Sequence, residues 1–106
     1  MQSEECRMQN VMILFDGTED DADLILVPED MAEHINTIAH EFFRWAADPS
    51  SVHDFWAMQP NGRTVLALGT NEFIWYLNHH VITSGEQAEI VAQHIHYDPQ
   101  YPTAYF

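Results

Sequence analysis

Five of the ten side chains between Phe15 and Leu24 are carboxylates, the densest group of potentially reactive residues in the chain. They are Asp16, Glu19, Asp20, Asp21 and Asp23. A calcium loop of the EF-hand type needs a glycine at its sixth position, and Gly17 comes too early for that spacing. Catalytic carboxylates need partly buried surroundings that separate their pKa values. Five carboxylates between two apolar runs instead predict a solvated, ionised loop, although a nonspecific Ca²⁺ or Mg²⁺ site stays open.

Seven histidines form the second group with chemical potential, and four of them are candidate metal ligands. These four are His79, His80, His94 and His96. The two pairs would converge on a zinc ion, with Glu72 or Asp98 as an oxygen ligand, if their elements lay side by side. No spacing among them is diagnostic, so we expect ordinary surface or hydrogen-bonded histidines and no metal or cofactor.

No motif in the chain names a reaction. There is no G-x-S-x-G, no glycine loop for a phosphate and no C-x-x-C pair. Cys6 is the only cysteine, and we interpret it as an incidental thiol. The sequence therefore predicts a protein that is not an enzyme, and a histidine-rich metal-dependent enzyme is kept as an alternative.

The net charge decides which partners are compatible with the chain. It has 17 acidic residues, three arginines and no lysine, for a formal charge of −14. Binding to nucleic acid or to an anionic membrane surface needs a basic patch, so neither is expected. No apolar run approaches the roughly 20 residues of a membrane span, and the acidic N-terminus does not resemble a signal peptide. We expect a cytoplasmic protein that attracts a basic protein partner.

The apolar patterns predict the elements that position these residues in a single domain, 1–106. Strands at 10–15 and 22–28 form a hairpin around the acidic stretch. A helix follows at Pro28–Ala47, because Met31, Ile35, Ile38, Phe42 and Trp45 make one apolar stripe.

The second half of the chain is expected to add a hairpin at 54–68, with a type I′ turn at Asn61-Gly62. The segment 69–83 fits a strand or a helix, and its aromatic residues favour a third antiparallel strand. Ser84 and Gln87 make a capping box that predicts a second helix at 84–98, and an extended tail completes the chain. The expected fold class is α+β: a mostly antiparallel sheet of about five strands with two helices against it, in the order β-β-α-β-β-β-α.

Aromatic residues are more numerous than one small core can hide, which suggests that some of them anchor a partner inside a charged rim. The predicted partner-binding residues are the loop acids Asp16, Glu19, Asp20, Asp21 and Asp23, the helix acids Glu29, Asp30 and Glu33, and the aromatic side chains of Trp56 and Tyr76.

In size, acidity and lack of a catalytic motif, the chain resembles the small cytoplasmic immunity proteins that bacteria pair with toxins. Barstar-like inhibitors and immunity proteins of contact-dependent growth inhibition belong to that group. The resemblance implies an inhibitor that neutralises a basic protein such as a nuclease toxin, with a compact acidic patch beside an apolar one. The alternative is a phage anti-defence protein, such as an anti-CRISPR that mimics nucleic acid, with carboxylates spaced along an elongated surface.

Overall fold

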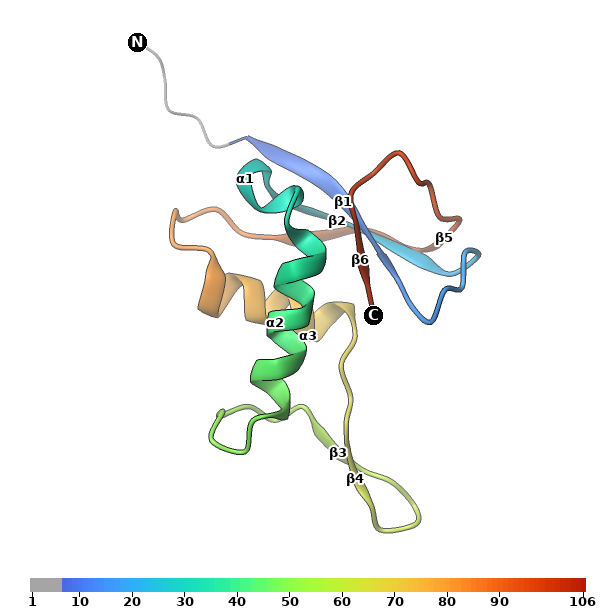
Figure 1. The fold of residues 1–106 in the computed structure, drawn as a ribbon, viewed down its shortest axis with the longest axis vertical. Coiled ribbons are helices and arrows are strands. Elements are labelled where there is room, and N and C mark those ends of the chain that lie inside the picture. The colour runs from blue at the N-terminus through green and yellow to red at the C-terminus, as the bar shows by residue number, and fades with distance from the viewer. Residues whose placement is uncertain (1–6) are drawn as a thin grey trace.

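A four-stranded sheet in the order β5-β2-β1-β6 carries the fold in the computed structural model, which describes residues 7–106 (Figure 1). Its strands are β1 (Met8–Leu14), β2 (Ala22–Pro28), β5 (Glu89–Ile95) and β6 (Thr103–Tyr105). β2 is antiparallel to both β1 and β5, whereas β6 is parallel to β1. The α+β class is confirmed, but the sheet is mixed and has fewer strands than expected. Cys6 lies outside the described residues.

The hairpin of β1 and β2 forms as predicted, and its register pairs Met8 with Pro28 and Ile13 with Asp23. The strands are near-continuous apolar runs because both faces of the sheet are covered. Val11 and Ile25 pack in the main core on one face, while Met12 packs on the other in a smaller cluster with Leu14 and Ala22. Burial on both faces replaces the alternation that a half-exposed strand shows.

The predicted helix Pro28–Ala47 divides into two. α1 (Glu29–Ala32) continues directly from β2, and α2 (Ile35–Ala47) begins after a break at Glu33 and His34. The chain changes direction at this break, and α2 then runs past β6 and α3 (Figure 1). Pro28 ends β2 with an extended backbone and is not the first helical residue.

α2 supplies the centre of the main core. Its buried residues are Ile35, Ala39, Phe42 and Ala46, spaced as one helical face. The Phe42 ring is fully buried and lies 5.0 Å from the ring of Tyr76 and 5.4 Å from that of Phe73, between centroids. The prediction that Phe42 is a core residue is confirmed, and Trp45 is partly buried against the same cluster.

The segment predicted as a third antiparallel strand is helical, so that prediction is wrong. α3 (Thr70–Tyr76) continues into a π-helical turn, η1 (Leu77–Val81). The Glu72 carboxylate accepts a hydrogen bond from the Gly69 backbone N–H at 2.9 Å and so caps the first turn. Phe73, Tyr76 and Leu77 are buried at helical spacing. The helical spacing of these buried residues decides the structure of the segment, and the strand-like alternation of its aromatic residues does not.

The predicted second helix at 84–98 is also wrong, because this segment contains strand β5. The capping box does not form, since the Ser84 hydroxyl donates to Glu86 instead. Asn78 of η1 bonds the backbone N–H and C=O of Ala88 and leads the chain to the outer edge of β2. Val91 of β5 is half exposed.

The hairpin of β3 (Trp56–Met58) and β4 (Thr64–Leu66) is confirmed, and it extends away from the four-stranded sheet (Figure 1). Its turn is not the predicted type I′, because Gly62 has a positive φ of 86° and Asn61 does not. The Gly62 N–H donates to the Gln59 carbonyl at 2.9 Å. Pro60 at the first corner restricts φ to negative values and selects this turn.

The predicted extended tail is extended only in its later part. Residues 99–101 form a turn, in which the Tyr101 N–H donates to the Asp98 carbonyl at 3.3 Å, and β6 follows. Phe106 then donates its backbone N–H to the Leu14 carbonyl at 2.9 Å. Within residues 7–106, no helix has the length and apolar character needed to cross a membrane.

Candidate functional site

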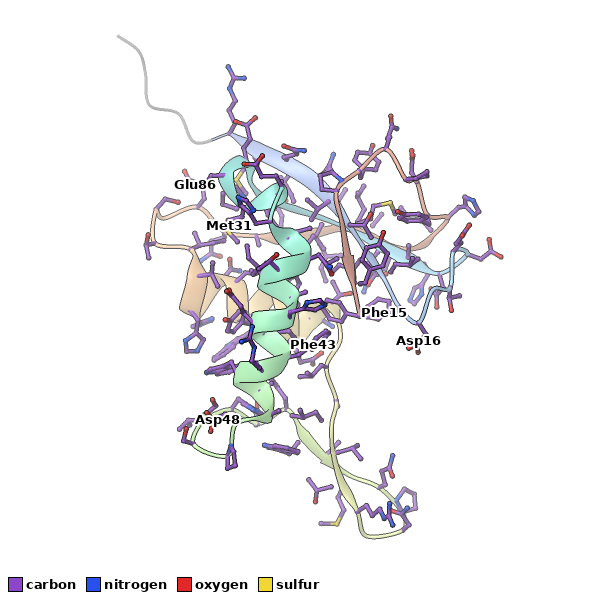
Figure 2. All side chains as sticks on the ribbon, viewed as in Figure 1. Phe15, Asp16, Met31, Phe43, Asp48 and Glu86 are labelled. Carbon is purple, nitrogen blue, oxygen red and sulfur yellow. The ribbon has the colours of Figure 1, made fainter. Side chains whose placement is uncertain are left out.

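The tip of the acidic loop is an Asp-Gly turn. Asp16 and Gly17 have positive φ values of 51° and 71°, and the Thr18 N–H donates to the Phe15 carbonyl at 2.9 Å. Two successive positive φ values are the signature of a type I′ turn. Asp16 stands at the outer end of this loop (Figure 2), and Glu19, Asp20 and Asp21 are exposed as predicted.

Asp23 departs from the predicted solvated loop and leaves the set of partner-binding residues. It is only 4% exposed. Its carboxylate accepts hydrogen bonds from the Thr70 hydroxyl, from the backbone N–H of His94 at 3.2 Å and from the Gln93 side chain at 3.3 Å. Asp23 therefore joins β2 to α3 and to β5, and it is a structural carboxylate.

Two histidines hold the acidic loop to the end of β5. The Nδ1 atom of His94 lies 2.5 Å from a carboxylate oxygen of Asp21, and Nδ1 of His96 lies 3.0 Å from one of Asp20. The hydrogen bond and the charge of Asp21 raise the pKa of His94 above its ordinary value, with a smaller contribution from Asp23. The Tyr97 N–H also donates to the Glu19 carbonyl at 2.7 Å. These contacts fix the acidic loop to the end of β5 and to the residues that follow it.

The candidate metal ligands are not brought together. His94 and His96 pair with the acidic loop, on the right in Figure 1, whereas His79 and His80 belong to η1, at the orange end of the helical segment on the left. The His79 ring bonds the Trp75 carbonyl at 2.9 Å and stacks on the indole with centroids 4.3 Å apart. Within residues 7–106, no group of three or more histidine, cysteine or acidic residues is arranged to hold a metal ion.

The predicted acidic surface divides into two parts. Glu29, Asp30 and Glu33 are exposed on or beside α1, at the end of β2, while the acidic loop lies at its start. Seven residues of strand separate them, roughly 20 Å at about 3.3 Å per residue. Figure 2 shows Met31 of α1 and Asp16 on opposite sides of the molecule.

Little of this negative charge is compensated inside the protein. The ion pairs within residues 7–106 all involve histidine, so no arginine there pairs with a carboxylate. The side chains of Asp16 and Glu19 make no hydrogen bond within that range. Uncompensated surface charge of one sign produces a field that attracts cations and basic proteins.

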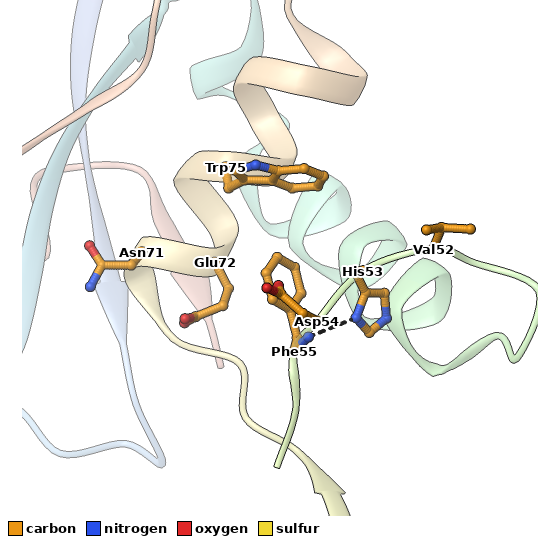
Figure 3. Close-up of a pocket in the computed structure, with 7 residues that line it drawn as sticks. All are labelled: Val52, His53, Asp54, Phe55, Asn71, Glu72 and Trp75. Carbon is orange, nitrogen blue, oxygen red and sulfur yellow. Dashed lines mark hydrogen bonds between the residues drawn. The ribbon is translucent and has the colours of Figure 1, made fainter.

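A pocket of about 690 Å³ lies between α3 and the segment that follows α2 (Figure 3). Its walls come from His53, Asp54 and Phe55 on one side and from Asn71, Glu72 and Trp75 on the other. Trp75 lies across the pocket above the carboxylates of Glu72 and Asp54 in Figure 3. The edge of the Phe55 ring faces the indole at 5.6 Å between centroids, with an interplanar angle of 89°. The volume is within the roughly 300–1,000 Å³ range of ligand sites.

His53 forms part of the pocket wall, and two hydrogen bonds fix the tautomer of its ring. Its Nδ1 accepts the Phe55 backbone N–H at 3.0 Å, and its Nε2 lies 2.8 Å from the Ala46 carbonyl. An accepting Nδ1 carries no proton, so Nε2 holds the proton and donates it to the carbonyl. In this arrangement the ring is neutral. It also satisfies a carbonyl in the last turn of α2 that lacks an intrahelical partner.

The two predicted aromatic anchors, Tyr76 and Trp56, differ in their exposure to solvent. Tyr76 is 9% exposed and packs on Phe42, so it belongs to the core and leaves the predicted contact surface. Burial, followed by the charge of Glu41, raises the pKa of its hydroxyl. Trp56 is 44% exposed and stacks beside His53 at 6.1 Å between centroids. It therefore adjoins the pocket and is accessible to a partner.

No family model, curated protein or solved structure matches the chain.

The sequence predicted an aromatic anchor inside a charged rim, but it did not predict that Asp54 and Glu72 line one pocket with Phe55 and Trp75. The relevant pattern is the helix start at Gly69, because a helix places Glu72 and Trp75 one turn apart on the same face. The strand interpretation of 69–83 would have put these two residues on opposite faces of a sheet.

Proposed function

We propose that this protein binds and neutralises a basic protein, as an immunity protein does with a bacterial toxin. The observation that carries the proposal is an open aromatic pocket with two carboxylates, in a molecule whose surface acids are not paired with arginine within residues 7–106. Aromatic anchors with a polar, charged rim are the usual anatomy of a protein interface.

The two features serve different stages of binding. Exposed carboxylates at the acidic loop and on α1 act over long range and raise the association rate by ~10–10³-fold. The aromatic groups around the pocket act on contact and slow dissociation. A nuclease toxin is a fitting partner, because its substrate groove presents lysine and arginine to phosphates and is attracted to the same field.

The distribution of the acids favours a second candidate, a phage anti-defence protein that mimics nucleic acid. A mimic needs carboxylates spread along a surface, and the acidic loop and α1 lie at opposite ends of one hairpin. Such a protein would occupy the nucleic-acid groove of a defence nuclease over a longer track than an immunity protein covers.

Coexpression distinguishes these functions. Each product of a neighbouring gene is expressed in bacteria with and without this protein. We expect one basic product to be toxic alone, to be harmless in its presence and to copurify with it. Rescue from a defence nuclease, with no toxin among the neighbours, would support the mimic. Failure to bind any basic neighbour or defence nuclease at low salt would contradict both proposals.

A further inference from the structure

We infer that the pocket between α3 and the segment 52–55 receives an arginine side chain of the partner protein. The inference rests on the proposed function and deepens it, because it names the contact that anchors the complex. It follows from the aromatic rings, the charge and the openness of this one site.

The exposed part of the Trp75 indole is a planar aromatic surface against which a planar ligand group can pack. Trp75 is 37% exposed, and His79 stacks against its indole at an interplanar angle of 18°. Figure 3 shows the pocket on the side of the indole where Glu72 and Phe55 lie. A guanidinium group is planar and stacks on aromatic faces, and a cation within about 6 Å of an indole centroid is attracted by the ring.

The charge of the pocket selects a cation. Asp54 and Glu72 line it, and none of its lining residues is a lysine or arginine. His53 is neutral in its observed hydrogen-bonding arrangement. Of the two Glu72 oxygens, Oε1 accepts the Gly69 N–H at 2.9 Å, which holds the carboxylate in place and leaves Oε2 for a ligand.

Arginine fits these walls better than lysine does. Its guanidinium has five N–H donors in a fixed planar arrangement and is less strongly hydrated than an ammonium group. It can pack against the exposed part of the Trp75 indole, beside the Phe55 ring, while donating to Glu72 on one wall and to Asp54 on the other. A lysine ammonium would also be attracted by the ring, but it is a compact, strongly hydrated point charge that cannot pack on the indole as a plane, so it gains less from these walls.

The inference is tested on the full chain with three capped tripeptides, Gly-Arg-Gly, Gly-Lys-Gly and Gly-citrulline-Gly. Citrulline has nearly the shape of arginine without its charge. Binding is followed by nitrogen–proton NMR correlation spectra, which separate the indole N–H of Trp75 from those of Trp45 and Trp56. We expect the arginine peptide to shift Trp75 and the amides of Phe55 and Asn71 in a saturable manner, and the other two peptides to bind at least about tenfold more weakly.

Matched variants locate the site. Glu72→Gln keeps an oxygen that accepts the Gly69 N–H but removes the charge, and Asp54→Asn removes the second charge. The double variant should bind the arginine peptide at least about tenfold more weakly. The control is Asp30→Asn with Glu33→Gln, which makes the same change in net charge beside α1 and should bind as the parent does.

Three results would overturn the inference: equal binding of the citrulline peptide, equal binding of the lysine peptide, or shifts confined to the acidic loop. Its failure is distinguishable from failure of the proposed function. Rescue of a toxic partner without arginine binding in the pocket would remove only the anchor. Arginine binding without any basic partner would remove the function and leave the site.

Discussion

At the scale of single residues, the loop acids have three different roles. Asp16 and Glu19 face solvent, and Asp20 and Asp21 pair with histidines at the end of β5. Asp23 is buried, and its carboxylate accepts hydrogen bonds. Asp16 and Glu19 are the two of these five whose side chains make no hydrogen bond or ion pair within residues 7–106. A composition count treats all five alike, whereas the structure separates paired from unpaired carboxylates, and we propose that the unpaired ones carry most of the long-range attraction.

The pair of His94 and Asp21 makes stability depend on pH. The pKa of His94 is raised in the folded protein, chiefly by its hydrogen bond to Asp21. The folded state then holds the proton more tightly than the unfolded state does. The stabilising contribution is full below the unfolded pKa of about 6.5 and is lost as pH rises through the higher folded pKa.

We therefore predict that the parent loses more stability than the variant His94→Asn between pH 6 and pH 8. Asparagine is the matched replacement because position 94 has a φ of 59°, which asparagine tolerates. Urea unfolding at both pH values measures the difference. Parallel pH dependence of parent and variant would show that the pair has no effect on stability.

Asp23 should be essential for stability, and Glu19 should not. Asp23→Ala removes a charged acceptor from the Thr70 hydroxyl and the His94 N–H. We expect a loss of about 1.5–3 kcal/mol in the free energy of unfolding, as for hydrogen bonds to charged groups. Glu19→Ala, on the exposed loop, should change it by less than about 0.5 kcal/mol. Equal urea midpoints for the two variants would contradict the structural role of Asp23.

At the scale of elements, the first half of the chain was predictable, apart from the break between α1 and α2, because local pattern and packing agree. The β1–β2 runs are apolar on both faces, and α2 buries one helical stripe. The second half failed where two patterns competed. Phe73, Trp75 and Leu77 alternate as in a strand, yet Phe73, Tyr76 and Leu77 are the buried set. Residues 89–95 fit a helix by their sequence pattern, but they form a strand because they pair with the edge of β2 that β1 leaves free.

The candidate site was only partly predictable for the same reason. The exposure of Asp16 and Glu19 follows from a turn sequence, which is local. The burial of Asp23 depends on Thr70 and His94, which lie 47 and 71 residues further along the chain. The pocket joins the segment after α2 to α3, and its second wall exists only if residues 70–76 are helical.

The packing of α2 against α3 predicts a large effect of one core substitution. Phe42→Ala removes a fully buried ring that contacts Phe73, Tyr76 and Phe106. It should cost about 3–5 kcal/mol, as for other buried phenylalanines. Glu33→Ala, in the exposed break between α1 and α2, should be close to neutral. Thermal unfolding measures both, and a Phe42→Ala protein as stable as the parent would contradict the assignment of α2 to the core.

At the scale of the whole molecule, the exposed carboxylates and the aromatic pocket lie in different regions. The acidic loop and α1 occupy two ends of the β1–β2 hairpin (Figure 1). The aromatic pocket lies between α3 and residues 52–55, which precede β3. A partner that is attracted by the field therefore need not contact each carboxylate. Loop charges should act on encounter, and pocket residues on the lifetime of the complex.

The rate of association with the basic partner tests this account most directly. Stopped-flow mixing is done at low and at physiological salt with the parent and with the variant Asp16→Asn, Glu19→Gln, which leaves the histidine pairs and Asp23 intact. We predict association several-fold slower for the variant at low salt, a difference that shrinks as the screening length falls to about 8 Å, and little change in dissociation. An association rate that is unchanged at low salt would contradict the account, because the acidic loop would then be no more than a solvated turn.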